Sequence, residues 1–366
     1  MRQHGPDVLV SSGAPFDPRG GMAASYANIA RLLRERGYEV AERYGPVASG
    51  RLGWFKRQSE YARVAGALQR QRPRVAIVSS ADSSVAALLP HRTRVVAMSN
   101  GIEHLARQAA DTHGYGQHHF TWGHRHVREP LLRVAFQRAD ACVVLSRGQR
   151  DFVTATWGID PARVHVLPQS VEDAFHKRRD LPRDPDRVLW IGQWAEFKGL
   201  DRLREIVAAV VAERPSTRFV LAGVKTDPQQ VIASFPAHLR GNLEVHPVVE
   251  RGTMVDLVAT AHAGLVTSYF EGFGKMILEK LAGGLPTVAS RVAASEDYVE
   301  HGVSGYLYDT AEEATRLLLE VMAAPYDAAM GDAARAAVRT CRRATVGDAW
   351  SAIVAEQLSA GPRGRA

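Results

Sequence analysis

Two carboxylates eight positions apart carry the clearest chemical signal in this sequence. Glu271 precedes a glycine-rich turn, and Glu279 follows inside a short apolar-patterned segment. Because glycine permits backbone angles and close approaches that a Cβ resists, the amides of Gly272 and Gly274 can face a ligand. A helix that starts near Lys275 presents unpaired N–H groups and partial positive charge to an anion. The spacing therefore predicts a clamp for an extended, anionic, hydroxyl-bearing ligand.

The elements that position these carboxylates follow from the apolar pattern. Residues 263–268 form a short apolar run that ends in polar residues, which is typical of a buried parallel strand. A helix is expected over about 275–283, since glycines 283 and 284 and a proline at 286 stop it. At ~1.5 Å per residue, Glu279 lies roughly 6–8 Å farther along the axis than the loop. The two carboxylates can then address different ends of one ligand.

Strand-like apolar runs alternate with helical patterns along the whole chain. This alternation predicts an α/β fold with parallel sheets covered on both faces. The runs are 7–11, 75–79, 94–98, 141–145, 187–191, 218–222, 243–247, 264–267 and 287–289. A polar, proline-marked stretch over 177–186 reads as a linker. We therefore expect domains over 1–185 and 186–345, followed by a helical segment over 346–366.

Five segments keep a fixed order along the chain and match a known pattern. They are 18–22 (PRGGM), 164–175 (VHVLPQSVEDAF), 188–199 (VLWIGQWAEFKG), 219–223 (FVLAG) and 269–290. Together they resemble the retaining glycosyltransferases of family 4, and the stretch from Glu271 to Glu279 resembles the E-x7-E signature of that family. The resemblance covers nearly the full chain. It implies a GT-B fold, in which two Rossmann-like parallel-sheet domains face each other across a cleft.

The resemblance also implies roles for individual residues. The N-terminal domain would bind the acceptor and the C-terminal domain the nucleotide-sugar donor, with the last helix returning to the N-terminal domain. Glu271 would contact the donor sugar, Glu279 the ribose hydroxyls and Lys198 the diphosphate. The implied catalytic residues are Glu271, Lys198, His104 and Asn100. The implied donor-binding residues are Gly20, Gly21, Gly192, Gln193, Lys198, Gly223, Val249, Glu271, Gly272, Phe273, Gly274, Lys275 and Glu279.

Three places depart from the family pattern. Gln193 stands where a basic residue is common, and Lys275 is the candidate that compensates for it. Asn100 stands where the family commonly has histidine, and His104 follows one helical turn later, so both are candidates to contact the donor sugar or the acceptor. The segment Pro168-Gln169-Ser170 stands where the family commonly has Asn-Gly. These departures leave the phosphate contacts and the substrates open.

Charge divides the chain into unlike halves. Residues 1–185 hold 27 Lys and Arg against 17 Asp and Glu, whereas the remainder holds 19 against 22. The positive half suits an acidic or lipid-linked acceptor, or an anionic membrane surface touched through residues 51–74. An arginine-rich composition without such a role is the alternative. No zinc spacing, RNA-binding signature or basic helix-turn-helix is present, so nucleic acid is not expected as a partner.

Cysteine content and hydropathy bear on the compartment. Cys142 and Cys341 are the two cysteines, and no apolar run approaches the ~20 residues that span a bilayer. We expect a cytoplasmic enzyme, with peripheral contact to the inner face of the membrane as a further option. Residues 113–126 hold five histidines. Without a paired-cysteine frame they predict no metal site, and a loop in the acceptor cleft and a solvated loop both stay open as interpretations.

The reaction implied is transfer of a sugar from a nucleoside-diphosphate sugar to a hydroxyl of a saccharide, lipid-linked or natural-product acceptor, with retention and without a metal or other cofactor. Two alternatives stay open. One is another GT-B enzyme, such as a nucleotide-sugar epimerase or a phosphorylase. The other is a non-catalytic nucleotide-sugar-binding protein, because a fold alone does not establish a function. The sequence does not choose the nucleobase, the sugar, the acceptor or the oligomeric state.

Overall fold

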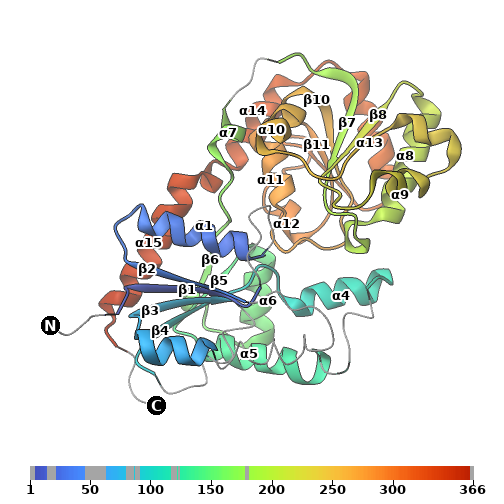
Figure 1. Cartoon of the computed structure of the whole chain (residues 1–366). Helices are drawn as coiled ribbons and strands as arrows, with labels where there is room; N and C mark the ends of the chain where they lie inside the picture. Colours follow the sequence, from blue (N-terminus) through green and yellow to red (C-terminus); the bar gives the residue numbers. More distant parts are fainter. Residues whose placement is uncertain are drawn as a thin grey trace. The chain divides into compact units, whose positions relative to one another are not determined.

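A computed structural model describes residues 5–14, 22–45, 63–79, 86, 91–116, 122, 124–177 and 181–362. The chain divides into two compact units. The first comprises Met1–His104, Phe120–Gln169 and Arg343–Ala366, and the second comprises Leu105–His119 and Ser170–Arg342. Each unit is an α/β structure built on one sheet (Figure 1).

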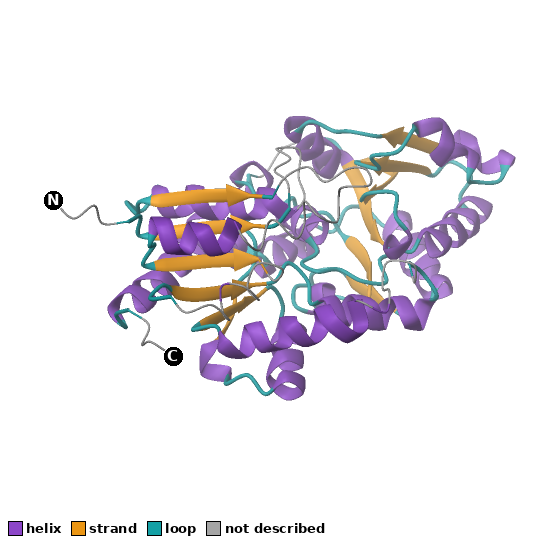
Figure 2. Ribbon diagram, turned by 60° about the horizontal axis from the view of Figure 1, so that its bottom comes forward, coloured by secondary structure: helices purple, strands orange, loops and turns teal. Residues whose placement is uncertain are grey.

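The first unit contains a six-stranded parallel sheet in the order β2-β1-β3-β4-β5-β6. The strands are β1 (Val8–Ser12), β2 (Val40–Tyr44), β3 (Val75–Ser79), β4 (Arg94–Met98), β5 (Ala141–Val144) and β6 (Val164–Val166). Their arrows run in one direction in Figure 2. Every residue of β1 and β3 is buried, as expected for central strands covered on both faces.

Helices cover this sheet on both faces (Figure 1). They are α1 (Met22–Arg34), α5 (Glu129–Arg138), α6 (Arg147–Trp157) and α15 (Arg343–Ser359), with the short helices η2 (His124–Arg128) and η3 (Pro161–Arg163). Local signals set the bounds of α6: the Ser146 side chain accepts from the Gln149 amide, and Gly158 ends the helix at φ +67°. A further helix, α4 (Glu103–His113), begins in the first unit and continues in the second.

The last helix, α15, belongs to the first unit although it follows the whole second unit in sequence. Arg36 donates to the Asp348 carboxylate at 2.8 and 3.0 Å, and the Tyr38 hydroxyl lies 3.0 Å from Ser351 Oγ. Trp350 is buried on the same helix. These contacts tie α15 to the end of α1 and the turn that follows it.

The second unit repeats the architecture, with a parallel sheet in the order β12-β11-β10-β7-β8-β9. Its strands are β7 (Asp184–Ile191), β8 (Arg218–Ala222), β9 (Leu243–His246), β10 (Ala261–Val266), β11 (Thr287–Ser290) and β12 (Tyr306–Tyr308). Its helices are α7 (Asp173–His176), α8 (Leu200–Glu213), α9 (Pro228–Ala233), α10 (Arg251–Thr260), α11 (Lys275–Ala282), α12 (Ala293–Glu296), α13 (Ala311–Ala323) and α14 (Ala328–Ala337), with η4 (Glu196–Lys198), η5 (Ala237–Asn242) and η6 (Arg339–Cys341).

The core of the second unit lies between its sheet and the helices α8 and α13. Leu203, Ile206 and Val207 of α8 and Leu318 of α13 are fully buried in one cluster with Trp190 of β7. The apolar spacing on α8 is that of a helix face turned to a sheet. Two covered faces explain why every residue of β10 is buried and why all of them except His262 lack a polar side chain.

The two parallel sheets confirm the predicted α/β class. Each predicted strand overlaps an observed one, while β2, β6 and β12 were not predicted. The predicted boundary at 185 and the structural division differ, because residues 170–184 lie with the second unit: Val171 pairs with Arg342 in an isolated bridge. Among the described residues, every helix is too short or too polar to span a bilayer.

Candidate donor site at the switch point of the second sheet

The order of the second sheet defines where a ligand would lie. From β7 the chain moves to β8 and β9 on one side, and then returns to β10 on the other side of β7. The loops that follow β7 and β10 therefore leave the sheet in opposite directions, and open α/β sheets bind ligands at such a point. Lys198 follows β7 and Glu271 follows β10, so the structure brings these two predicted residues together.

Lys198 and Glu271 form a buried ion pair. The Lys198 Nζ donates to Glu271 Oε1 at 2.5 Å, and the two side chains are 10% and 9% exposed. The Ser268 hydroxyl donates to the same oxygen at 2.6 Å. A charge-assisted hydrogen bond in a poorly solvated place is strong and directional. The pair therefore holds an ammonium and a carboxylate at fixed positions beside the end of β10.

The backbone of the Lys198 loop is fastened to the end of β10. Thr267 Oγ1 donates to the Lys198 carbonyl at 2.6 Å and accepts from Trp190 Nε1 at 3.0 Å. Gly199 has φ +66°, and a Cβ there would lie 2.1 Å from the Thr267 carbonyl oxygen. Only glycine allows this approach, so Gly199 fixes where Lys198 leaves the chain.

Glu279 lies behind the turn, fully buried on α11. Its Oε1 accepts from Arg251 at 2.7 Å and lies 3.8 Å from Lys275 Nζ. Its Oε2 has no hydrogen-bond partner within the described part of the chain. A buried carboxylate oxygen of this kind can accept hydrogen bonds from ligand hydroxyls. Arg251 also donates to Glu172 at 2.8 Å, which holds its guanidinium over Glu279.

The turn between the two carboxylates contains a left-handed backbone conformation that glycine allows. Gly274 caps α11 at φ +75°, and a Cβ there would lie 3.0 Å from the side chains of Ala294 and Ile277. Phe273 is buried next to it. Glycine at 274 therefore lets the start of α11 pack against Ala294 of α12.

The remaining predicted donor residues lie on neighbouring loops of the same sheet. Gly192 follows β7, and its amide donates to the Ala222 carbonyl at 3.0 Å. Gln193 is exposed, Gly223 follows β8 at φ +73°, and Val249 is half-buried before α10. All of these follow the carboxyl ends of their strands. The set thus surrounds one edge of the second sheet.

Two predicted residues of the first unit lie in different surroundings. Asn100, just after β4, accepts from Gln169 at 3.0 Å, and Gln169 in turn accepts from Ser25 at 2.9 Å. His104 lies 3.0 Å from the buried Glu129, with its ring 5.6 Å from that of Trp157. Asn100 therefore belongs to a polar chain at the carboxyl end of the sheet, whereas His104 is held in an aromatic and ionic cluster.

Some predicted residues lie outside the described part of the chain. These are Gly20, Gly21, residues 51–62 of the basic segment, and residues 117–121 and 123 of the histidine-rich segment. His113 is described, and its ring stacks on Tyr269 at 4.1 Å. Burial, with a contribution from Arg202, lowers the pKa of His113. Within the described ranges, no three His, Cys, Asp or Glu residues gather as metal ligands would.

Sequence reasoning missed several contacts that build the site. The family resemblance places Arg251 in a stretch, 248–251, that would hold the nucleobase, but it does not predict the pairing of Arg251 with Glu279. Ser268 and Thr267 were interpreted as the end of a strand, and Ser25 was not singled out. A polar residue directly after a buried parallel strand was the available signal for Ser268. The ion pair between Arg251 and Glu279 joins residues 28 positions apart, so no local sequence pattern could have predicted it.

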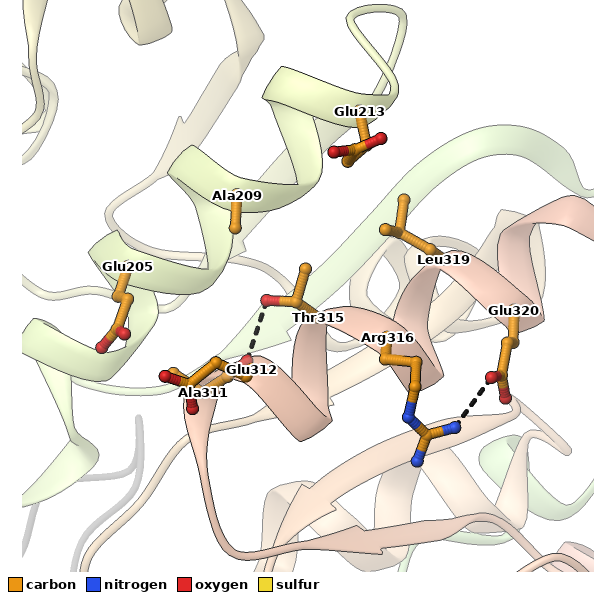
Figure 3. A pocket seen from close by; sticks show the side chains of 9 residues that line it. All are labelled: Glu205, Ala209, Glu213, Ala311, Glu312, Thr315, Arg316, Leu319 and Glu320. Atoms are coloured by element: carbon orange, nitrogen blue, oxygen red, sulfur yellow. Dashed lines mark hydrogen bonds and ion pairs between the residues drawn. The ribbon is translucent and has the colours of Figure 1, made fainter.

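A groove of about 450 Å³ lies elsewhere in the second unit, between α8 and α13. Figure 3 shows Glu205 and Glu213 reaching from α8, and Glu312 and Glu320 from α13, around a floor that includes Ala209. The lining also holds Arg316, which pairs with Glu320 at 2.7 Å, so the groove keeps an excess of negative charge that repels an anionic ligand. This groove is therefore unsuited to a diphosphate, unlike the surroundings of Lys198.

Comparison with solved structures defines the class of fold. Sucrose-phosphate synthase from Thermosynechococcus elongatus matches with a TM-score of 0.81 over 97% of this chain and 100% of that chain, at 16% identity. Anabaena HepE in complex with UDP matches with a TM-score of 0.68, covering 97% and 100%, also at 16% identity. At such identities the likeness shows the fold alone, and the fold is GT-B.

The sequence comparisons give the family. Residues 19–175 match the model described as Glycosyltransferase Family 4, and residues 185–323 match that of Glycosyl transferases group 1. A D-inositol 3-phosphate glycosyltransferase of Xylanimonas cellulosilytica is 28% identical over 208 residues, half of this chain and 49% of the relative. The chain thus spans about half the length of the curated relatives it matches. It belongs to glycosyltransferase family 4.

Proposed function

We propose that this protein transfers a glycosyl group from a nucleoside-diphosphate sugar to a hydroxyl, with the anomeric configuration of the donor retained. The observation that carries this proposal is the buried Lys198–Glu271 pair at the switch point of the second sheet. Beside it lies Glu279, whose buried Oε2 has no partner among the described residues. This arrangement offers one cation and two carboxylates to a ligand that carries a diphosphate between two hydroxyl-rich groups.

The donor fits this set of groups by its chemistry. The diphosphate would lie against Lys198, Lys275 and the first amides of α11, where cations and a helix N-terminus favour negative charge. The ribose hydroxyls would donate to Glu279, since a carboxylate accepts two hydrogen bonds from a vicinal diol. The sugar would lie against Glu271. Because Lys198 and Lys275 would neutralise the negative charge of the diphosphate, we propose that the transfer needs no metal or other cofactor.

Retention is proposed to occur by front-face displacement. The bond from the anomeric carbon to the diphosphate oxygen breaks, and a bond to the acceptor oxygen forms on the same face. The departing diphosphate oxygen takes the proton of the acceptor hydroxyl. Such a reaction requires orientation of both substrates and stabilisation of charge on the leaving group, and Lys198 supplies the latter.

The acceptor is proposed to be a hydroxyl compound that carries negative charge. The positive excess of residues 1–185 would concentrate such a compound. Relatives named D-inositol 3-phosphate glycosyltransferase make a phosphorylated polyol one candidate, and saccharide or lipid-linked acceptors are others. The HepE complex makes UDP the first nucleotide to test.

We also propose peripheral contact with an anionic membrane through the basic first half. The attraction should weaken with salt, because screening shortens the reach of surface charge. Flotation with phosphatidylglycerol vesicles at low salt should carry the protein, and phosphatidylcholine vesicles should not. Equal flotation with both lipids, or with neither, contradicts this part of the proposal.

The proposed activity is tested by incubating the protein with UDP-, GDP-, ADP- and dTDP-sugars and a panel of polyol, phosphopolyol and saccharide acceptors. NMR of the product should show the donor's own anomeric configuration, and nucleoside diphosphate should appear only when acceptor is present. Donor breakdown without acceptor would favour an epimerase, and transfer to free phosphate a phosphorylase. Donor binding without turnover would favour a non-catalytic binding protein.

A further inference from the structure

Lys280, in the second unit, has no exposed surface. It follows Glu279 on α11, and its Nζ has no hydrogen-bond partner within the ranges that the structure describes. Burying a polar group without a partner is costly, and burying a charge more so. An apolar side chain of similar length would fill the same space without that cost. The amine is therefore retained at the expense of stability, which is common at functional sites.

The neighbouring sheet leaves room for the Lys280 side chain. A Cβ at Gly264 of β10 would lie 2.8 Å from Lys280 Cδ and 2.8 Å from Thr287 Oγ1. The stem therefore crosses β10 at a position where only glycine fits. β10 ends at Val266, and its loop carries Glu271. Because residue 264 has no side chain, the Lys280 stem can pass β10, the strand whose following loop carries Glu271.

Three charged groups act on the amine. They are Lys198 of η4, Glu271 of the loop after β10, and Glu279 of α11 itself. Burial in the first place, and then the charge of Lys198, lower the pKa of Lys280 to about 7, while the two carboxylates oppose this change. Near neutral pH the amine can therefore gain or lose a proton when its neighbours change.

We propose that Lys280 is a reserve cation for Glu271, protonated when a donor diphosphate draws Lys198 away. Without a donor, Lys198 neutralises Glu271 at 2.5 Å and repels a second positive charge. A diphosphate on Lys198 removes that repulsion and deprives Glu271 of its cation. Both changes favour an ammonium at Lys280, formed by uptake of one proton from solvent. Lys280 is thus a positioning residue that keeps Glu271 ionised and in place, and the inference rests on the proposed donor site.

Calorimetry of UDP binding at pH 8, in buffers of different ionisation enthalpy, measures that proton directly. The wild-type protein should take up a substantial fraction of a proton per UDP bound, and Lys280→Met should take up none. Lys275→Met is the matched control on the same helix. It should bind UDP more weakly and still take up the proton. Equal uptake in the wild type and Lys280→Met overturns the inference.

The same titration separates this inference from the proposed function. If UDP, GDP, ADP and dTDP all fail to bind both proteins, the donor site itself is refuted, and the reserve cation with it. Binding to both proteins without any proton uptake refutes the reserve cation alone. The pH profile of kcat does not depend on packing alone. Wild-type kcat should fall as pH rises above the pKa that Lys280 has when donor is bound, and kcat of Lys280→Met should be low without that fall.

Stability without any ligand tests the buried amine. Since the pKa of Lys280 in the folded protein lies below the usual lysine value of 10.5, the unfolded chain binds more protons between pH 7 and 10.5. The free energy of unfolding of the wild type should therefore increase relative to that of Lys280→Met as pH rises through this window. Lys280→Met should have the higher Tm at pH 7, and Lys280→Leu gives a second variant for the comparison. A large loss of Tm in both variants at pH 7 contradicts the inference, because it makes the amine structural.

Discussion

At the scale of single residues, the chemistry rests on an ammonium and a carboxylate held in a nearly dry place. Lys198 and Glu271 are paired to each other, and Ser268 adds a neutral donor to the same oxygen. A ligand that carries negative charge can compete for Lys198, and a ligand that carries hydroxyls can use Glu271. The pair is therefore a resting arrangement that a donor would reorganise.

Replacing Glu271 tests this account. Glu271→Gln should lower kcat by roughly 10²–10³-fold, because it removes an ion aligned with the reacting groups. Steady-state kinetics with the identified donor measure the loss. Asp186→Asn is the matched control, since Asp186 is paired with Arg214 at 2.8 Å on the strand β7 that also leads to Lys198. A similar loss of kcat in both variants would count against a chemical role for Glu271.

The thiols give a prediction that depends on pH. Burial raises the pKa of Cys142 to about 12 and that of Cys341 to about 11. Because the thiolate is the reactive form, both cysteines should resist a thiol-specific chromogenic reagent at pH 8 in the folded protein. Both should react after denaturation. Rapid labelling of either cysteine under native conditions would show that it is not buried.

At the scale of elements, the loops after β7 and β10 are locked by contacts that glycine makes possible. Gly199 approaches the Thr267 carbonyl, and Thr267 binds the Lys198 carbonyl. The two loops therefore hold each other, and the position of Lys198 depends on the backbone as much as on its own side chain.

Gly199→Ala should damage both stability and turnover. A Cβ there meets a carbonyl oxygen at 2.1 Å, and φ is +66°, so we expect a loss of more than ~2 kcal/mol. Gly302→Ala is the control, because Gly302 has φ +79° with no atom near its Cβ position. It should cost only about 1 kcal/mol. Chemical denaturation measures both, and equal costs would contradict the steric argument.

Much of this element structure was predictable from sequence, for physical reasons. Strands such as β3 and β10 are buried on both faces, and their continuous apolar runs reveal them. By contrast, β2 is partly exposed and mixes charged with apolar residues, and β12 has three residues. Such strands are defined by pairing with a neighbour, which no local pattern records.

The candidate site was predictable to a similar extent. Glycines and carboxylates with a fixed local spacing located the Glu271–Glu279 stretch. The Arg251–Glu279 pair and the passage of Lys280 across Gly264 depend on the packing of separate elements. The surroundings of His104 were not predictable. Its position one helical turn after Asn100 suggested a ligand contact, but its contacts with Glu129 and Trp157 join residues that are distant in the sequence.

At the scale of the whole molecule, the chain folds as two units, each built on one six-stranded parallel sheet, and the chain passes between the units more than once. The first unit needs residues from both ends of the chain, because α15 packs beside α1 through Asp348 and Ser351. The first unit is therefore incomplete until the last helix has been made.

This dependence predicts a strong effect of Trp350. Trp350→Ala should lower stability by about 3–5 kcal/mol, because a large buried side chain is replaced by a cavity. Denaturant titration followed by circular dichroism measures the change. Glu356→Ala, at an exposed position of α15, should change stability by less than ~0.5 kcal/mol. If the two variants were equally stable, α15 would not be part of the core of the first unit.

The central claim is that the second unit binds a nucleoside-diphosphate sugar through Glu279 and its neighbours. Thermal denaturation with UDP, GDP, ADP and dTDP, in the wild type and in Glu279→Gln, tests it most directly, because a ligand that binds only the folded state raises Tm with its concentration. We predict a selective, concentration-dependent rise for one nucleotide, and affinity roughly ten-fold or more weaker in Glu279→Gln. No rise with any nucleotide, or the same rise in both proteins, would contradict the account.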